Sequence, residues 1–152
     1  MEEFNLEEII SQDSGIYARW LIGRVRHLMS KERQKELVPY HVTSPQAFIL
    51  FVLKHLGHNA SLAELARYCG RGINTLSVQM IRLEKDGLVK KVKEVPRSKI
   101  LKFYLTEKGI ETYYPSSKKE SEIAAMSVLS EEERQQLISL LKKLIKKAEK
   151  YQ

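Results

Sequence analysis

The sequence of 152 residues contains a single cysteine and no long hydrophobic run, and both absences narrow the class of protein. One cysteine cannot form an internal disulfide, so no disulfide framework holds this fold. No apolar run approaches the roughly 18 residues that a membrane-spanning helix requires. The first residues are acidic, whereas an export signal would begin with basic ones, so we expect a cytoplasmic protein with no membrane partner.

The sequence also lacks the motifs of common enzymes and metal sites. It contains no glycine-rich phosphate loop, no nucleophile elbow and no paired acidic motif. His55 and His58 are close in sequence, but Gly57 between them ends a helical pattern, and no cysteine or carboxylate cluster completes a zinc site. We therefore expect neither an enzyme nor a protein with a metal or cofactor.

The positive charge is concentrated in one stretch of the chain. The net charge of +7 comes from 26 Lys and Arg against 19 Asp and Glu. Residues 61–108 hold 11 basic and 5 acidic side chains, whereas residues 1–60 are neutral and residues 109–152 carry a net charge of +1. A basic surface confined to one module is the electrostatic pattern expected for a polyanionic partner.

This basic stretch has the pattern of a helix-turn-helix followed by a β-wing. Residues 62–68 and 73–86 have helical spacing, and two glycines lie in the turn between them. Residues 88–93 and 99–104 have the composition of strands, with a proline-containing tip between them. In this order of elements, the second helix usually enters the major groove of DNA.

Amphipathic helices are predicted on both sides of the basic stretch. Apolar residues recur at gaps of three and four over residues 6–31 and again over residues 137–148. Residues 32–41 show no clear period and contain a proline, so we expect a loop there. Thr43 then has the position of an N-cap for a buried helix, and Pro115 predicts a kink or a break before the last helix. The apolar stripe of the last helix predicts contacts with the first helix and with a second subunit.

The second helix of the helix-turn-helix has a polar face opposite its predicted core stripe. We assign the inward stripe to Leu76, Met80 and Leu83. At 100° per residue, the opposite face then carries Asn74 and Val78. Asn can pair with adenine, and Val can contact the methyl group of thymine. A merely solvated face is the alternative, which the accompanying wing disfavours.

Other candidate DNA contacts flank this face or lie in the turn and the wing. The neighbouring hydroxyl side chains suit phosphates, Arg82 can reach a phosphate or a guanine, and Arg71 in the turn can contact the backbone. Arg97 and Lys99 at the wing tip can enter a minor groove, whose negative potential attracts such side chains. The candidate DNA-binding residues are therefore Arg71, Asn74, Thr75, Ser77, Val78, Arg82, Arg97 and Lys99.

Short motifs along nearly the whole chain resemble MarR-type winged-helix regulators. In order, they are Thr43-Ser44-Pro45-Gln46, Leu62-Ala63-Glu64-Leu65-Ala66, Thr75-Leu76-Ser77, Arg82-Leu83-Glu84-Lys85-Asp86-Gly87-Leu88-Val89, Leu105-Thr106-Glu107-Lys108-Gly109 and Leu129-Ser130-Glu131-Glu132-Glu133-Arg134. Their shared order and spacing carry the resemblance. It implies a homodimer, held by its N- and C-terminal helices, that binds a pseudo-palindromic operator and is regulated by a small ligand or an oxidant.

The chain departs from the family pattern at two places. The family usually has Asp-x-Arg in the wing, whereas the matching positions here are Arg97-Ser98-Lys99. Gly72 also replaces the Ser that often caps the recognition helix. This departure leaves two alternatives for the wing contact: it is placed differently in this chain, or it contributes affinity without sequence preference.

Two features bear on regulation. Oxidant-sensing members of the family carry their cysteine near the start of the first helix, where this chain has none, so we expect Cys69 to be a structural thiol; a redox role would need a lowered pKa. The resemblance also places an aromatic group in the effector region, and such groups on helices belong more often to a core than to a pocket. Its members are Tyr17, Trp20, Tyr40, His41, Phe48 and Phe51.

Together these features predict a mainly α fold with a small β-wing, a winged helix-turn-helix between dimerisation helices. We expect an N-terminal dimerisation helix and loop in residues 1–42, the winged helix-turn-helix in residues 43–108, and C-terminal dimerisation helices in residues 109–152. The predicted function is a homodimeric transcriptional regulator, more often a repressor in such families, that binds double-stranded DNA and responds to a small aromatic or amphipathic effector. A winged helix that mediates protein assembly and an RNA-binding accessory module remain as alternatives.

Overall fold

The computed structural model describes residues 5–93 and 101–151. The predicted wing tip, with Arg97 and Lys99, therefore lies outside the described residues. The chain divides into two compact units, Met1–Lys119 and Glu120–Gln152.

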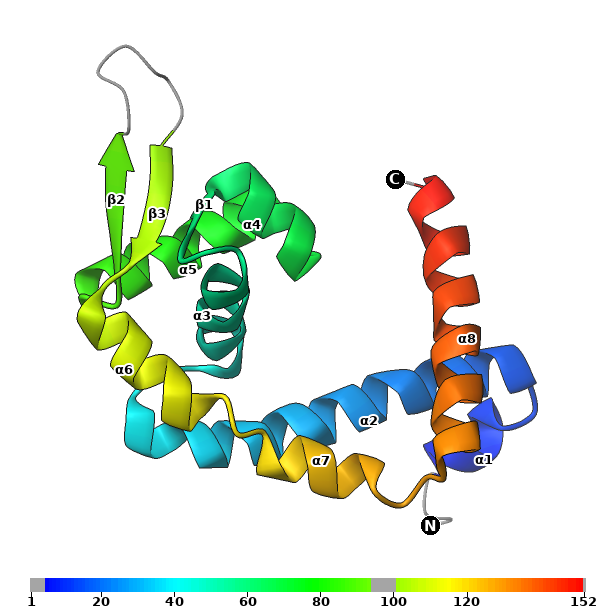
Figure 1. The fold of residues 1–152 in the computed structure, drawn as a ribbon. Coiled ribbons are helices and arrows are strands. Elements are labelled where there is room, and N and C mark those ends of the chain that lie inside the picture. The colour runs from blue at the N-terminus through cyan, green and yellow to red at the C-terminus, as the bar shows by residue number, and fades with distance from the viewer. Residues whose placement is uncertain (1–4, 94–100, 152) are drawn as a thin grey trace. The chain divides into compact units, whose positions relative to one another are not determined.

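The first unit contains six helices, a 3₁₀ turn and three strands among its described residues (Figure 1). In chain order they are α1 (Leu6–Ile10), α2 (Ser14–Leu37), η1 (Val38–Tyr40), α3 (Ser44–His55), β1 (Asn59–Ser61), α4 (Leu62–Cys69), α5 (Ile73–Lys85), β2 (Val89–Lys93), β3 (Leu101–Leu105) and α6 (Glu107–Ser116). The second unit consists of α7 (Glu120–Met126), α8 (Glu131–Ala148) and the 3₁₀ turn η2 (Glu149–Tyr151).

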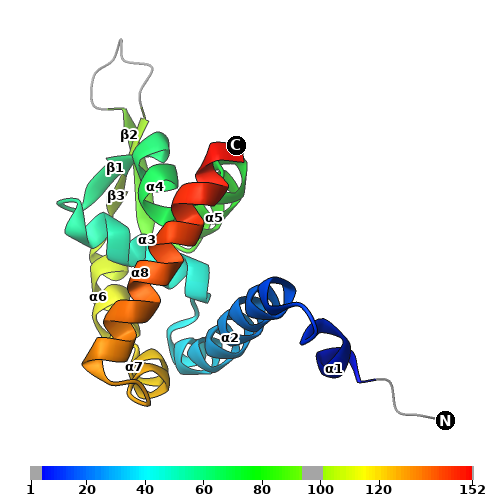
Figure 2. The ribbon, with the colours of Figure 1, turned by 90° about the vertical axis from the view of Figure 1, so that its right-hand side faces the viewer.

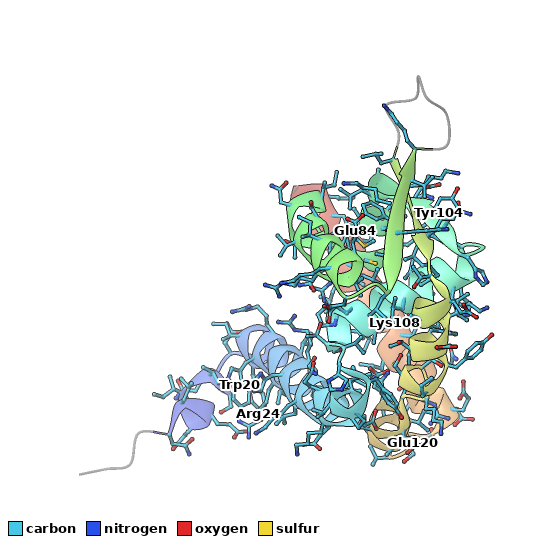
Figure 3. All side chains as sticks on the ribbon, turned by 90° about the vertical axis from the view of Figure 1, so that its left-hand side faces the viewer. Trp20, Arg24, Glu84, Tyr104, Lys108 and Glu120 are labelled. Carbon is cyan, nitrogen blue, oxygen red and sulfur yellow. The ribbon has the colours of Figure 1, made fainter. Side chains whose placement is uncertain are left out.

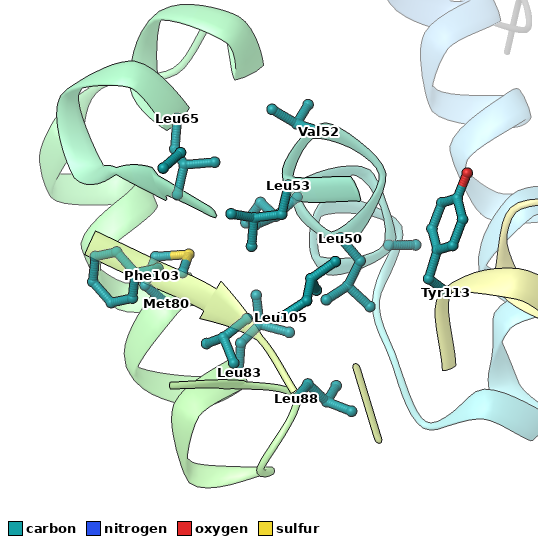
Figure 4. Close-up of a cluster of buried hydrophobic side chains, with 14 of the residues drawn as sticks. Leu50, Val52, Leu53, Leu65, Met80, Leu83, Leu88, Phe103, Leu105 and Tyr113 are labelled. Atoms are coloured by element: carbon teal, nitrogen blue, oxygen red, sulfur yellow. The ribbon is translucent and has the colours of Figure 1, made fainter. Parts of the chain in front are cut away.

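Helix α3 lies in the core of the first unit. It begins with the predicted N-cap, because the Thr43 hydroxyl accepts the Gln46 N–H and the Gln46 side chain accepts the Thr43 N–H at 2.8 Å. Its side chains Ile49, Leu50 and Leu53 are at most 1% exposed. Figure 4 shows Leu50 and Leu53 within the cluster of buried side chains that α5 and β3 complete. Burial of each such side chain contributes about 1.5–3 kcal/mol.

The predicted helix-turn-helix is confirmed as α4 and α5. A second capping box, between Ser61 and Glu64, begins α4. The helix ends at Gly70, whose φ of +59° is in the left-handed region that glycine adopts without strain. The predicted inward stripe of α5 is also confirmed, because Leu76, Met80 and Leu83 are at most 1% exposed. These contacts fix the rotation of α5 about its axis.

The wing is part of a three-stranded antiparallel sheet in the order β1-β3-β2 (Figure 2). Val89 pairs with Leu105 and Lys91 pairs with Phe103 in the β2–β3 hairpin. The sequence did not predict β1, whose Ala60 pairs with Phe103 on the other side of β3. This strand has only three residues, and only pairing with a distant segment makes it a strand.

The prediction of one helix over residues 6–31 and a loop over residues 32–41 is wrong in both parts. Asp13 separates α1 from α2, because its carboxylate accepts the N–H groups of Gly15 and Ile16 at 2.8 and 3.0 Å as an N-cap. Helix α2 then continues to its buried residue Leu37. Its other buried residue, Arg33, is charged and therefore interrupts the apolar period from which the helix was predicted.

Arg33 is buried because its charge is satisfied within the fold. One guanidinium nitrogen donates to the Glu36 carboxylate at 2.7 Å, and the other donates to the backbone carbonyl of Ser116. The second bond joins the C-terminal part of α2 to the C-terminal end of α6. The side chain therefore ties together two elements that are far apart in sequence.

Pro115 marks a break rather than a kink. Helix α6 ends one residue later, at Ser116, and α7 begins at Glu120. In the second unit, Ser130 and Glu133 form a third capping box at the start of α8. None of the helices in the described residues combines the length and hydropathy needed to span a membrane.

We predict that Gly109→Ala destabilises the first unit, whereas Gly23→Ala does not. A Cβ added at Gly109 would lie 2.0 Å from the carbonyl oxygen of Leu88, which also accepts the Thr106 N–H. Relieving this overlap requires a backbone shift, with an expected loss of about 1–3 kcal/mol in unfolding free energy. Urea unfolding measures the change.

Gly23 is the matched control, because a Cβ there meets nothing within 4 Å in the chain. Alanine inside α2 should leave the stability unchanged or raise it by up to about 1 kcal/mol. Equal effects of the two substitutions would contradict the proposed close approach at Gly109.

Candidate nucleic-acid interface

Helix α5 presents a continuous outward stripe opposite its buried stripe. Asn74, Val78, Ile81 and Lys85 are exposed and recur at gaps of four, three and four residues, which places them on one face. Val78 is 48% exposed and Ile81 is 63% exposed. The structure therefore brings the predicted Asn74 and Val78 together and adds two residues that were not among the predicted contacts.

The other predicted contacts on this motif flank the stripe. Thr75 and Arg82 are exposed, Ser77 is half-buried, and Arg71 is exposed in the turn before α5. Arg97 and Lys99 lie outside the described residues. Six of the eight predicted DNA-binding residues thus lie on α5 or immediately before it, within one continuous surface.

The N-terminus of α5 differs from those of the other long helices. The N-caps of α2, α3, α4, α6 and α8 each accept a backbone N–H with a side-chain oxygen. Gly72 caps α5 and supplies no such acceptor. The first-turn N–H groups of α5 are therefore available to an external acceptor, and a phosphate oxygen is the group that a helix N-terminus favours.

Basic side chains continue from α5 onto the wing. Lys90, Lys91 and Lys93 are exposed on β2. In the antiparallel register, Lys91 and Lys93 lie opposite Phe103 and Leu101, on the same side of the hairpin as the core-facing Phe103. The strand thereby adds positive charge beside the helix-turn-helix, where it would attract a phosphate backbone in a salt-dependent manner.

Helix α4 contributes a pair of exposed side chains that sequence reasoning missed. The Arg67 guanidinium carbon lies 4.7 Å from the centroid of the Tyr68 ring, and Arg67 donates to the Tyr68 hydroxyl at 2.9 Å. Both side chains are exposed. The first helix of a helix-turn-helix crosses the DNA backbone. Adjacent polar residues at the end of this helix could therefore have been predicted from the sequence as candidate backbone contacts.

Cys69 lies at the end of α4 and is half-buried. Burial raises the pKa of its thiol, and the positive charge of Arg71 opposes this effect only in part. A reactive sensor cysteine needs the opposite shift, toward a lower pKa. The electrostatics therefore favour the structural role that we expected for this residue.

A cavity of about 520 Å³ lies beneath the C-terminal end of α5. Lys108, labelled in Figure 3, is one of its lining residues and donates from its ammonium group to the backbone carbonyl of Asp86 at 2.7 Å. The residues that line the cavity come from η1, from the segment after α5 and from α6. They are Pro39, Tyr40, His41, Asp86, Leu88, Lys108, Glu111, Thr112 and Pro115.

The aromatic residues in the predicted effector region come from α2, from α3 and from η1 with the residue after it. Tyr40 and His41 line this cavity. The rings of Tyr17 and Trp20 stack on α2 with centroids 6.0 Å apart, and those of Phe48 and Phe51 stack on α3 at the same separation. That these six residues belong to one effector region stays a prediction.

The histidine pair that the sequence singled out makes other contacts. The Nδ1 atom of His55 lies 2.8 Å from the carbonyl oxygen of Phe51, and the Nε2 atom of His58 lies 3.0 Å from the Lys54 ammonium nitrogen. In residues 5–93 and 101–151, no three or more His, Cys, Asp and Glu side chains are grouped as metal ligands.

Comparisons with known proteins agree with this geometry. Residues 42–109 match the model of a family described as a winged helix DNA-binding domain. The organohalide-sensing transcriptional regulator RdhR, in its 2,4-dichlorophenol-bound form, is 26% identical with a TM-score of 0.82, and the match covers 95% of this chain and 85% of that chain. A sequence search of curated proteins gave no match.

Two further structures have the same fold at lower identity. MepR from S. aureus, in a DNA complex, is 23% identical with a TM-score of 0.77 over 90% of this chain and 99% of that chain. AbsC from Streptomyces coelicolor, a MarR family transcriptional regulator, is 22% identical with a TM-score of 0.78 over 90% of this chain and 96% of that chain. These neighbours are described as regulators rather than enzymes.

We predict that Cys69 reacts slowly with iodoacetamide in the folded protein. Because burial raises the pKa of the thiol, less thiolate is present near neutral pH than after unfolding in urea. Alkylation followed by mass spectrometry should be severalfold slower before unfolding.

Arg71→Ala tests the direction in which a neighbouring charge changes the pKa of Cys69. Removing the positive charge that lowers the pKa of Cys69 should raise that pKa further and slow alkylation of the folded protein. A folded thiol that reacts as fast as the unfolded one would mean that Cys69 is activated.

Proposed function

Because this chain carries a winged helix DNA-binding domain and has the fold of MarR-family transcriptional regulators, we propose that it is a homodimeric repressor of transcription that acts in the cytoplasm. It binds a pseudo-palindromic operator, with one α5 helix in the major groove of each half-site. The observation that carries the proposal is the exposed stripe of α5, flanked by basic side chains of the turn and of β2.

Within each half-site, the side chains divide between bases and phosphates. Asn74 pairs with an adenine, and Val78 contacts a thymine methyl group. The flanking residues Thr75, Ser77, Arg71 and Arg82 position α5 through phosphate contacts, together with the first-turn N–H groups after Gly72. Arg97 and Lys99 approach the adjacent minor groove from the wing.

Exposed apolar side chains support the homodimer. On α2, the residues Ile16, Leu21, Ile22, Val25 and Leu28 are between 38% and 55% exposed. On α8, Leu140, Leu144 and Ile145 are between 55% and 57% exposed. Apolar surface of this extent on a single chain marks an interface, so we assign both helices to contacts between two copies. Two-fold symmetry then presents two α5 helices to the two half-sites.

We place the effector site in the cavity beneath α5. A ligand there would contact Asp86 and Leu88, which follow α5 directly, and Tyr40 of η1. An effector that binds better to one orientation of α5 shifts the dimer toward that orientation and changes its affinity for DNA. The lining combines apolar and polar side chains, which suits a small aromatic compound with one polar group.

The alternatives predict different behaviour in solution. A winged helix that mediates protein assembly would show no salt-dependent affinity for DNA. An RNA-binding accessory module would show no preference for a symmetric pair of DNA half-sites. The available first-turn N–H groups of α5 and the adjacent basic strand favour a phosphate backbone over a protein partner, whereas the half-site test separates DNA from RNA.

We predict sequence-specific, salt-dependent binding to duplex DNA from the chain's own upstream region. Asn74→Ala should reduce the preference for this duplex over a random duplex by about 1–3 kcal/mol, because a base contact is lost. Lys91→Ala should weaken binding to both duplexes equally and reduce the salt slope by about one, because only a phosphate contact is lost. Fluorescence anisotropy at several salt concentrations measures both effects.

A flat salt response, or equal affinity for the random duplex, would contradict the proposed function. A uniform loss of affinity in Asn74→Ala would remove this residue from the base contacts. Sedimentation at micromolar concentration tests the assembly separately, since a monomer would overturn the homodimer.

We predict that 2,4-dichlorophenol, the compound bound in the RdhR structure, weakens operator binding by the wild type but not by Thr112→Trp. The indole ring would occupy the cavity, which Thr112 lines. Lys118→Trp adds the same ring outside the cavity and should retain the response. Loss of the response in both variants, or in neither, would place the effector elsewhere.

A further inference from the structure

The outward stripe of α5 is unusually apolar for an exposed helical face. Val78 and Ile81 are 48% and 63% exposed, and they lie next to each other on that face. Both are β-branched and so are weaker helix formers than the straight-chain residues that usually cover an exposed helix. The described residues of this chain leave about half of Val78 and more than half of Ile81 uncovered.

The groove-facing half of α5 is also uncharged. Residues 73–81 contain no Lys, Arg, Asp or Glu. In the major groove, guanine is recognised best by the paired donors of Arg or Lys, and cytosine by the acceptors of Asp or Glu. The side chains that remain on this face pair with adenine, through an amide, or contact the methyl group of thymine, through an apolar surface.

We infer that α5 recognises A·T base pairs, with Asn74 on an adenine and with Val78 and Ile81 on thymine methyl groups. Ile81 thereby becomes a specificity-determining residue. At about 1.5 Å of rise per residue, the distance from Asn74 to Ile81 is about 10 Å, which corresponds to about three base-pair steps of DNA. The inference rests on the proposed function, because it requires that α5 enters the major groove.

Charge favours DNA over a second protein chain as the group that covers this face. Arg82 and Lys85 on α5, Arg71 in the turn before it and Lys91 on β2 are exposed, whereas Glu84 is the one acidic residue of α5. A second copy of the same surface would bring like charges together, whereas a phosphate backbone on each side of the groove would neutralise them. The first-turn N–H groups of α5, left without a side-chain cap at Gly72, also favour an anion.

Deoxyuridine provides a direct test, because it differs from thymidine only by the missing methyl group. The full-length wild type is first used to select its preferred duplex from a randomised pool, and base contacts are located by footprinting. Each thymidine in the contacted half-site is then replaced by deoxyuridine, one position at a time. Since a buried methylene contributes about 0.8 kcal/mol, we expect about a fourfold loss of affinity at each contacted position.

The variants assign each methyl group to a side chain. Val78→Ala and Ile81→Ala should each become insensitive to deoxyuridine at one position and should remain sensitive at the other. Val38→Ala is the matched control: Val38 is 64% exposed on η1 and is not among the candidate DNA contacts, so this variant should keep the wild-type sensitivity at both positions. All three substituted side chains are exposed or nearly half exposed, and thermal unfolding verifies that the variants fold.

Three outcomes would overturn the inference while leaving the proposed function in place. In the first, the half-sites obtained by selection have G·C pairs beneath α5. In the second, no deoxyuridine changes the affinity of the wild type. In the third, the wild type and both α5 variants are equally sensitive to deoxyuridine. Dissociation of the dimer by Ile81→Ala would show that a second copy covers this face, which also overturns it. If the selection enriches no sequence at all, the proposed function fails and this inference fails with it.

Discussion

Burial of α3 is the constraint on which the rest of the first unit depends. Its buried apolar side chains cover most of its circumference, and only the face with Phe48 and His55 is exposed, so α2, α4, α5, α6 and the sheet pack around the rest. The packing of α5 against α3 stabilises the unit and also determines which face of α5 is exposed. Once Leu76, Met80 and Leu83 turn inward, the geometry of the helix leaves only one face for a partner. The candidate interface therefore consists of the α5 residues on the face opposite its buried stripe.

The parts of the fold that depend on local chemistry could be predicted from the sequence. The predicted N-cap at Thr43 is confirmed, and Ser61 and Ser130 form caps of the same local kind, because each hydroxyl pairs with an amide or carboxylate side chain only three residues away. The errors arose where distant segments decide the structure. The buried Arg33 side chain donates to a carbonyl 83 residues away, and β1 is a strand only because β3 lies beside it.

The same division applies to the candidate site. The exposed stripe of α5 follows from periodicity, so the sequence placed Asn74 and Val78 correctly on one face, although their contacts with bases remain predictions. The cavity beneath α5 could not be predicted, because it is lined by η1, by the segment after α5 and by α6. Gly72 is intermediate between these cases. The sequence showed it as a departure from the family pattern. Only the comparison with the side-chain caps of the other helices shows that α5 lacks such an acceptor at its start.

The position of β2 gives its lysines a second consequence. In the order β1-β3-β2, this strand forms an outer edge of the sheet, and an unpaired edge is a template on which another chain can add a strand. Strand pairing at this edge is disfavoured by Lys90, Lys91 and Lys93, because a second strand would have to place its side chains beside three positive charges. The charge that would attract DNA therefore also protects the free protein from aggregation, so the wing cannot be made neutral without cost to solubility.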